Sequence, residues 1–491
     1  MQNNYSEKQS LNRSNILDQL KIDQAFRLAK EKIKCNETEE AKKIYNDILT
    51  KFPKNKKALI AINSFPKKFI TAKNASLDPP NEALHDIVNL YNTGEIHRAL
   101  KISIDLLETY PNSAQLHNFC GTCNATLNRF DIAITAFKNA IANSPNFIDA
   151  HYNLGVAAKT NKDLKQAEIS YKKVLALDPN HVDALNNLGT IYYEQKYYKR
   201  AINSYKAALA KNPTHLHANF NNASALRDSG QFKKAISAYE KLLELNPDFP
   251  KALTDLGEIF KAQGKMQKAM KLYKKALKID PEYAEAYFLL GNALTDLDDT
   301  KKALQNYKKA IQIKSDYAEP WAKMADIYRE KNDFEKAQIS YEAAIDLNPN
   351  CASTWDGLGI LNRLNSELDQ AIKHFNIALK LDPERVRTYS NLATVLNDNG
   401  EQDKSIATHE LAIQKNPNSA AVYLNFGVTL DHNEDAKNAI EMYKKAIELE
   451  PEYAIAHANL GFLYLFQGDL KRAVEHRKWR WKTKENKNKL N

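Results

Sequence analysis

The chain has 491 residues, of which 43% are hydrophobic and 26% are charged, and its formal net charge at pH 7 is +10. No stretch approaches the roughly 18 to 20 apolar residues that span a bilayer, and residues 1–15 lack the apolar run of a signal peptide, so we expect a soluble cytoplasmic protein without membrane contacts. Four cysteines in a chain of this length do not make a disulfide framework and fit a reducing compartment.

The positive charge is concentrated at the two ends of the chain. Residues 1–80 hold 16 basic and 9 acidic side chains, and residues 471–491 hold 9 and 2, so each end carries +7. The sequence between them carries −4. This distribution does not indicate a nucleic-acid channel along the middle of the chain, and nucleic acid is not the partner we expect.

The N-terminal region contains a tail, a small helical unit and a linker. Residues 1–21 are polar and without periodicity, which predicts a disordered tail. Residues 22–63 predict a helical hairpin and a short third helix, with Ala25 and Leu28 on the first helix and Tyr45 and Ile48 on the second. Residues 64–80, with three prolines among scattered Lys and Asn, read as a linker.

From residue 81 to residue 470 one helix-turn-helix pattern recurs every 34 residues. In residues 180–213, Val182, Leu185 and Leu188 share one helical stripe, and Tyr198, Ile202 and Tyr205 share the next. Ten of the 16 prolines keep this period: Pro111, Pro145, Pro179, Pro213, Pro247, Pro281, Pro349, Pro383, Pro417 and Pro451. Such a period predicts an all-α chain folded as an α-solenoid, in which each hairpin packs on its neighbours.

Other positions recur with the same period when each repeat is numbered from 1 at residues 80, 114, 148 and every 34 residues to 454. From the repeat at residue 114 onward position 8 is Gly or Ala; position 20 is almost always Ala, and position 24 is usually aromatic, as in Gly189, Ala201 and Tyr205. Glycine within a helix costs about 1 kcal/mol relative to alanine. We therefore expect position 8 to allow a close approach of the paired helices, and the aromatic ring to fill the wedge between one hairpin and the next.

These spacings resemble the tetratricopeptide repeat family, whose motif has Leu-Gly, Ala, an aromatic, Ala and Pro at the same intervals. The resemblance covers about four fifths of the chain and implies a right-handed superhelix of twelve to thirteen hairpins. The pattern is also similar to arrays that precede glycosyltransferase-like (O-linked N-acetylglucosamine transferase type) or sulfotransferase domains in bacterial proteins. Such arrays serve many partners, so the resemblance specifies fold more closely than function.

Motifs for catalysis are absent from the sequence: there is no phosphate-binding glycine loop, HExxH motif or nucleophile elbow. Cys120 and Cys123 form a CxxC, but Cys120 takes the Leu position of the motif in the middle of a helix, which favours buried packing thiols over a reactive pair. His215 and His217 lack an evident third ligand. We expect no catalytic residue, no metal and no cofactor.

Asparagine recurs at position 6, on the first helix of the hairpin. Six repeats carry it: Asn153, Asn187, Asn221, Asn391, Asn425 and Asn459. A side-chain amide can donate to and accept from a peptide group, and an extended peptide rising about 3.3 Å per residue would meet one such amide at about every third residue. The row resembles the asparagine ladder that holds substrate polypeptide in protein O-linked N-acetylglucosamine transferases. Simple inheritance from one ancestral repeat explains it equally well.

The C-terminal segment, residues 471–491, departs from the repeat. It carries Trp479 and Trp481 within a basic stretch, and Arg477 stands where other repeats have an aromatic residue. One interpretation is a polar cap on the open end of the solenoid. The other is that the two tryptophans dock a further domain or a partner.

Our leading interpretation is a non-catalytic scaffold that binds an extended polypeptide in the groove lined by the first helices. A second interpretation makes the chain the substrate-recruiting part of a glycosyltransferase or sulfotransferase whose catalytic domain is in another chain or lost. A third, weaker one attaches the basic ends to an acidic surface such as nucleic acid. Self-association of arrays through their outward surfaces remains open.

Overall fold

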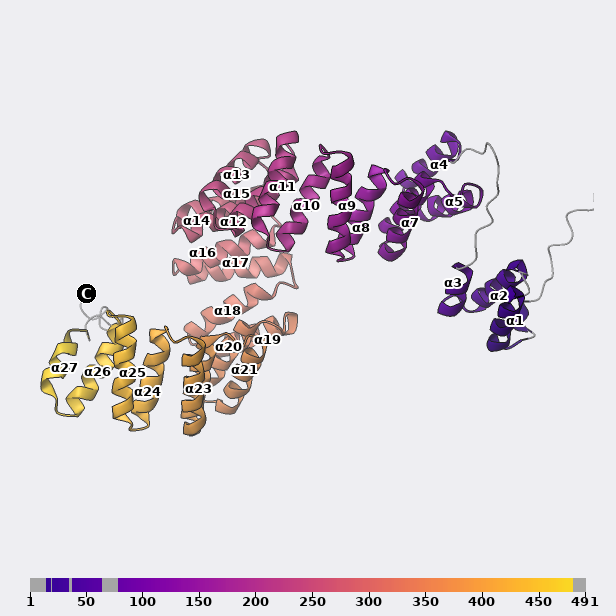
Figure 1. Ribbon diagram of the computed structural model, residues 1–491. Coiled ribbons are helices and arrows are strands. Elements are labelled where there is room, and N and C mark those ends of the chain that lie inside the picture. The colour runs from indigo at the N-terminus through magenta and orange to yellow at the C-terminus, as the bar shows by residue number, and fades with distance from the viewer. Residues whose placement is uncertain (1–14, 19, 35–37, 64–77, 480–491) are drawn as a thin grey trace, which may run out of the picture. The chain divides into compact units, whose positions relative to one another are not determined.

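The computed structural model describes residues 15–18, 20–34, 38–63 and 78–479 (Figure 1). All regular structure in these ranges is helical, so the predicted all-α class is confirmed. The tail before residue 15, the linker up to residue 77 and Trp481 lie outside the described residues. By its internal packing the chain divides into two compact units, residues 1–85 with 106–113 and residues 86–105 with 114–491.

The first unit contains a helical hairpin with a third helix. Its helices are η1 (Ile16–Asp18), α1 (Ile22–Lys34), α2 (Thr38–Lys51) and α3 (Lys56–Asn63). The core is formed by Ala25, Ala29, Ile44, Tyr45, Ile48 and Ala58. Residues 15–18 differ from the predicted disordered tail, because the amide of Asn15 donates to the Asp47 carbonyl at 2.9 Å and Ile16 packs on this core.

The other helices pair in sequence as hairpins of the predicted length, which confirms the α-solenoid. The first five hairpins are α4 (Asn81–Asn92) with α5 (Ile96–Thr109), α6 (Ala114–Thr126) with α7 (Phe130–Asn143), α8 (Ile148–Thr160) with α9 (Leu164–Leu177), α10 (Val182–Glu194) with α11 (Tyr198–Lys211), and α12 (Leu216–Asp228) with α13 (Phe232–Leu245). The next four are α14 (Pro250–Ala262) with α15 (Met266–Ile279), α16 (Ala284–Asp296) with α17 (Thr300–Ile313), α18 (Ala318–Glu330) with α19 (Phe334–Leu347), and α20 (Ala352–Leu364) with α21 (Leu368–Leu381). The last three are α22 (Val386–Asp398) with α23 (Gln402–Lys415), α24 (Ala420–His432) with α25 (Ala436–Leu449), and α26 (Ala454–Phe466) with α27 (Leu470–Arg477).

Each hairpin turns sharply between its two helices. Position 15 has a left-handed backbone in every one of these repeats, and glycine fills it in five, including Gly230 and Gly264. Asp at position 16 then caps several second helices: the Asp163 carboxylate accepts from the Gln166 N–H, and the Asp299 carboxylate accepts from the Lys302 N–H. The turn and cap together fix where the second helix begins.

The small residue at position 8 faces the aromatic ring at position 24 of the same hairpin. A Cβ built on Gly189 would lie 2.6 Å from the Tyr205 ring, and one built on Gly257 would lie 2.4 Å from the Tyr273 ring. We expected a small residue at position 8 so that the paired helices could approach closely. The structure shows that the aromatic ring at position 24 occupies the space that a larger position 8 side chain would need. The ring also reaches the following hairpin: a Cβ on Gly357, at position 6 of the next repeat, would lie 2.7 Å from the Tyr341 ring.

Candidate functional site

The asparagines at position 6 connect consecutive first helices. In four repeats the side-chain N–H donates to the position 5 side chain of the preceding repeat, 35 residues earlier. These bonds run from Asn153 to Asn118 Oδ1 (3.1 Å), Asn187 to Tyr152 Oη (3.1 Å), Asn221 to Asn186 Oδ1 (3.0 Å) and Asn391 to Asp356 Oδ1 (3.1 Å). We call the surface formed by positions 5, 6, 9, 12 and 13 of the first helices the first-helix face.

All six predicted asparagines are half-buried on this face. Each bonded amide uses one of its two N–H groups, so the second N–H and the carbonyl oxygen retain hydrogen-bonding capacity. Asn187 is an exception, because its Oδ1 also accepts from Asn186 Nδ2 at 3.3 Å. For Asn459 the preceding position 5 is Leu424, which offers no acceptor, and Asn425 follows Ser390.

A second row of contacts links position 12 to position 13 of the next repeat. Lys159 pairs with Glu194 at 3.3 Å, Lys261 with Asp296 at 3.1 Å and Arg363 with Asp398 at 2.7 Å. The Tyr193 hydroxyl donates to Asp228 in the same register. Sequence reasoning missed this row, although opposite charges recurring 35 residues apart were a visible signal. The two rows hold successive first helices at a fixed spacing.

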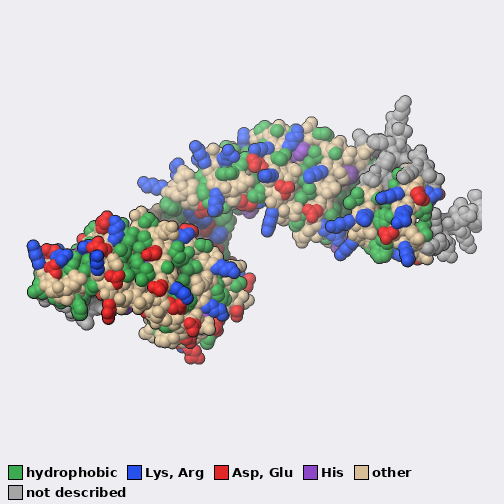
Figure 2. All heavy atoms as spheres, turned by 60° about the horizontal axis from the view of Figure 1, so that its bottom comes forward, with side chains coloured by type: hydrophobic (Ala, Val, Ile, Leu, Met, Phe, Trp, Pro, Cys, Tyr) green, Lys and Arg blue, Asp and Glu red, His purple; other side chains and the backbone are tan. Residues whose placement is uncertain are grey.

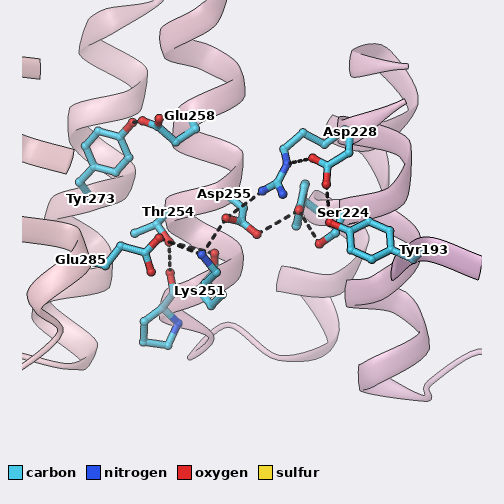
Figure 3. Close-up of polar contacts among 12 residues, drawn as sticks. Tyr193, Ser224, Asp228, Lys251, Thr254, Asp255, Glu258, Tyr273 and Glu285 are labelled. Atoms are coloured by element: carbon cyan, nitrogen blue, oxygen red, sulfur yellow. Dashed lines mark hydrogen bonds and ion pairs between the residues drawn. The ribbon is translucent and has the colours of Figure 1, made fainter. Parts of the chain in front are cut away.

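Between the two asparagine runs, a network of half-buried charged side chains surrounds the buried carboxylate of Asp255 (Figure 3). The Asp255 carboxylate is almost fully buried and contacts Arg227 at 2.9 Å, Lys251 at 3.2 Å and the Tyr239 hydroxyl at 3.2 Å. Lys251 also binds Glu285 at 2.9 Å. Asp255 stands at position 6, so an ion network takes the place of the amide in this part of the array.

The charges of this network stabilise one another. Burial alone would lower the pKa of Arg227, but its hydrogen bond to Asp228 and the charge of Asp255 raise it above the usual range. Burial would likewise raise the pKa of Glu285, but its hydrogen bonds from Lys251 and Tyr283 lower it. Arg227 and Glu285 are therefore charged at neutral pH, and each has an oppositely charged partner.

The two cysteines of the CxxC are buried in α6, as we expected. Burial raises the pKa of Cys120 to about 12 and that of Cys123 to about 11, so both are thiols at neutral pH and are poor nucleophiles. Among the described residues, no three His, Cys, Asp or Glu side chains are grouped so that they could hold a metal ion. His215 caps α12 by accepting from the Ala218 N–H.

Trp479 packs against the chain's own last hairpin. Its ring stacks on His457 of α26 with centroids 4.2 Å apart and planes 4° apart, and His457 Nδ1 lies 2.8 Å from His476 Nδ1. A docking role for Trp479 and Trp481 stays a prediction. The alternative of a polar cap stays a prediction as well; among the described residues of the last hairpin, Phe462, Leu465, Phe466 and Val474 are exposed.

No helix within the described residues is long and apolar enough to cross a membrane. Among solved structures, the "APC/C hetero-tetramer Cut9-Hcn1" matches with 14% identity over 91% of this chain and 97% of that chain, at a TM-score of 0.45. MamA matches with 30% identity over 33% of this chain and 95% of its own, and YrrB, "a TPR protein with an unusual peptide-binding site", matches with 23% identity over 38% and 95%, both at a TM-score of 0.31.

No curated protein matches the chain. Family models described as "Tetratricopeptide repeat" match residues 148–181, 182–215, 318–351 and 365–420. A model described as "TPR repeat" matches residues 223–264, 257–298, 291–328 and 434–468. Together these matches cover more than half of the chain, in the register that the prolines mark. The chain belongs to the tetratricopeptide repeat family.

Proposed function

We propose that the chain is a non-catalytic scaffold whose first-helix face binds an extended polypeptide segment of a partner protein. The observation that carries the proposal is the position 5–6 row of contacts. It fixes four of the six asparagine amides, those of Asn153, Asn187, Asn221 and Asn391, through one N–H each and leaves hydrogen-bonding capacity for a peptide group. An amide held in this way loses less conformational entropy when it binds than a free one does.

The spacing of the repeats supports backbone recognition. First helices of neighbouring hairpins lie about 8–10 Å apart, and an extended peptide rises about 3.3 Å per residue, so successive asparagines meet about every third peptide group. Repeat arrays of this kind present extended surfaces to protein partners. Because the Asp255 network separates the two asparagine runs, we infer two backbone-binding stretches, residues 153–221 and residues 391–459.

For the test, peptides that bind the full chain are first selected from a phage-displayed library of unstructured sequences. Their affinity is measured for the wild type, for a triple Asn153, Asn187, Asn221→Ala variant and for a control triple Asn139, Asn203, Asn306→Ala variant on the second helices. Each lost hydrogen bond is worth about 0.5–1.5 kcal/mol, so the site variant is expected to bind about tenfold to a thousandfold more weakly. The control variant should bind like the wild type.

Backbone recognition also makes a prediction about the ligand. N-methylation of about every third peptide nitrogen should abolish binding, while most side-chain changes should be tolerated. Equal affinities of the site variant and the wild type would contradict the proposal, and the position 6 asparagines would then serve only the contact between repeats. The interpretation as a recruiting part of a glycosyltransferase or sulfotransferase rests on the resemblance alone and would need a catalytic chain encoded nearby.

A further inference from the structure

A hollow of about 1070 Å³ lies between the second helices α13 and α15, over the first helix α14, whose place in the array Figure 1 shows. Its floor is formed by five apolar side chains: Leu243 of α13, Leu253, Leu256 and Phe260 of α14, and Leu272 of α15. Leu253 and Leu256 are almost fully buried, whereas the other three are half-buried and keep part of their apolar surface exposed. We call this hollow the second-helix groove.

The second-helix groove is separate from the first-helix face. Its three α14 side chains follow one another at a spacing of three and four residues, so they share one face of that helix. Asp255, at position 6, lies on another face of α14, where it contacts Arg227. A ligand in the second-helix groove would therefore not compete for the asparagine amides.

The two sides of the second-helix groove carry opposite charges. Glu240 and Glu244 stand on the α13 side, and Lys268, Lys271 and Lys275 stand on the α15 side. All five side chains are exposed, and none of them forms an ion pair within the described part of the chain. The acids and the lysines thus do not pair across the groove, and each side keeps its charge available to a ligand.

The lysines of α15 repel one another in the free chain. Lys271 and Lys275 are four residues apart, as are Lys274 and Lys278, and the helix contains no acidic residue. Like charges at this spacing destabilise a helix. On other second helices an acidic neighbour pairs with a lysine, as in Lys302–Asp299, Lys336–Asp333 and Lys444–Glu441. An acidic ligand would supply α15 with the missing opposite charge.

We propose that the second-helix groove binds an amphipathic helix of a partner protein. The apolar stripe of that helix lies on the groove floor, its acidic border faces α15 and its basic border faces α13. On α15 the basic side extends from Lys268 to Lys278, which is about 15 Å of helix and matches about three turns of a docked helix. Burial of the exposed apolar surface supplies the attraction, and the two charged borders select the partner and its direction.

Other occupants fit the second-helix groove less well. A nucleic acid or another polyanion would place negative charge against Glu240 and Glu244 and would leave the apolar floor uncovered. Two copies of the chain meeting groove to groove would leave both floors uncovered, because two hollows do not fill each other. An extended segment directs alternate side chains away from the floor. A helix alone presents an apolar stripe with a different charge on each border.

The probe for the experiment is a helix-stabilised, fluorescent peptide, LEKLLEKLEKLLEK, which has a leucine stripe with glutamates on one border and lysines on the other. Fluorescence polarisation with the full chain should show saturable binding. The double Lys271→Glu, Lys275→Glu variant should bind the peptide about tenfold more weakly, because two attractive contacts become repulsive. Circular dichroism should show unchanged helix content, since both side chains are exposed.

Two control variants make the result specific to the second-helix groove. The double Lys165→Glu, Lys173→Glu variant makes the same change of charge at exposed positions of α9 and should bind the peptide like the wild type. The triple Asn153, Asn187, Asn221→Ala variant should also keep its affinity. This second control separates the proposal from peptide binding on the first-helix face, so either one can fail without the other.

Two control peptides test the floor and the charged border. A peptide with Gln in place of every Leu keeps its charges and should show no saturable binding, because it cannot cover the floor. A peptide with Lys in place of every Glu should bind the wild type about tenfold more weakly, and should bind the Lys271→Glu, Lys275→Glu variant better than it binds the wild type.

The proposal is overturned if the probe shows no saturable binding, or if the Lys271→Glu, Lys275→Glu variant binds it as well as the wild type does. The basic ends of the chain would then hold the peptide. Equal binding of the Gln peptide and the probe would also overturn it, because the α15 lysines would then attract any anion without use of the apolar floor.

Discussion

At the scale of single residues, position 24 shows how one side chain sets the chemistry of its hairpin. Most repeats place Tyr or Phe there, and the ring takes the space above position 8. His409 holds position 24 in one repeat, opposite Ala393. It is fully buried, stacks on Phe426 with centroids 5.0 Å apart, and places Nε2 2.9 Å from the Thr429 hydroxyl. The imidazole of His409 thus stands where most repeats have a Tyr or Phe ring, which does not change its protonation between pH 5 and pH 8.

His409 should make the stability of its hairpin depend on pH. Burial lowers the pKa of His409 from 6.5 to about 4, so the folded chain holds it neutral while the unfolded chain binds a proton below about pH 6.5. Its contribution is therefore fully present above pH 6.5 and is lost as the pH falls toward 4. Between pH 7.5 and pH 5 we expect a loss of about 2 kcal/mol.

The measurement is hydrogen exchange of α22 to α24 at the two pH values, corrected for the intrinsic rate. The His409→Phe variant introduces the residue that position 24 has in Phe137 and Phe375, and it should lose most of this pH dependence. Because His374 and His476 also have lowered pKa values, the comparison is made between variant and wild type. The same pH dependence in both would show that His409 is not its source.

At the scale of elements, the Asp255 network should stabilise the helices from α12 to α16. Replacing Asp255 by Asn removes a nearly fully buried carboxylate that faces Arg227 and Lys251. Breaking a buried ion pair costs about 3–5 kcal/mol, and here we expect the lower end because Arg227 keeps Asp228 and Lys251 keeps Glu285.

Local hydrogen exchange suits this test, because a solenoid opens by neighbouring repeats and has no single unfolding free energy. Protection in α12 to α16 should fall, while α24 to α27 stay as in the wild type. Asp183→Asn is the matched control: that carboxylate pairs with His215 but is exposed, so its loss should stay within about 0.5 kcal/mol. Equal effects of the two substitutions would contradict a stabilising role for the network.

The sequence predicted the helices of the array well, because proline, the small residues and the aromatic each mark one step of a 34-residue period. It predicted the position 6 asparagines as a row but not their partners, since the contact joins position 6 to position 5 of the preceding repeat, and position 5 varies among Asn, Tyr and Asp. The exposed apolar side chains of the last hairpin were also missed. Phe466 stands at position 13, which is exposed in every repeat, whereas Val474 stands at position 21, which is buried or half-buried in the earlier repeats and exposed here.

At the scale of the whole molecule, the charge of the array is nearly balanced, but some of its helices carry only acidic and others only basic charged residues. The second helices α11, α15 and α17 carry basic residues and no acidic ones, whereas the first helices α10 and α16 carry acidic residues and no basic ones. On α15, Lys271, Lys274, Lys275 and Lys278 are exposed and have no ion-pair partner among the described residues. Figure 2 shows Lys and Arg side chains projecting from this part of the array.

This separation predicts that α15, as well as the basic C-terminal segment, holds polyanions. Replacing Lys271, Lys274, Lys275 and Lys278 by Gln should lower the salt concentration at which the chain elutes from heparin, because fewer counterions are released on binding. A control replaces Lys437, Lys444 and Lys445 on α25, where Lys444 and Lys445 already pair with Glu441 and Glu448, and should elute nearly as the wild type does. If instead only truncation after residue 479 changes elution, the array's own lysines do not contribute, and the ends alone carry the affinity for anions, as the sequence suggested.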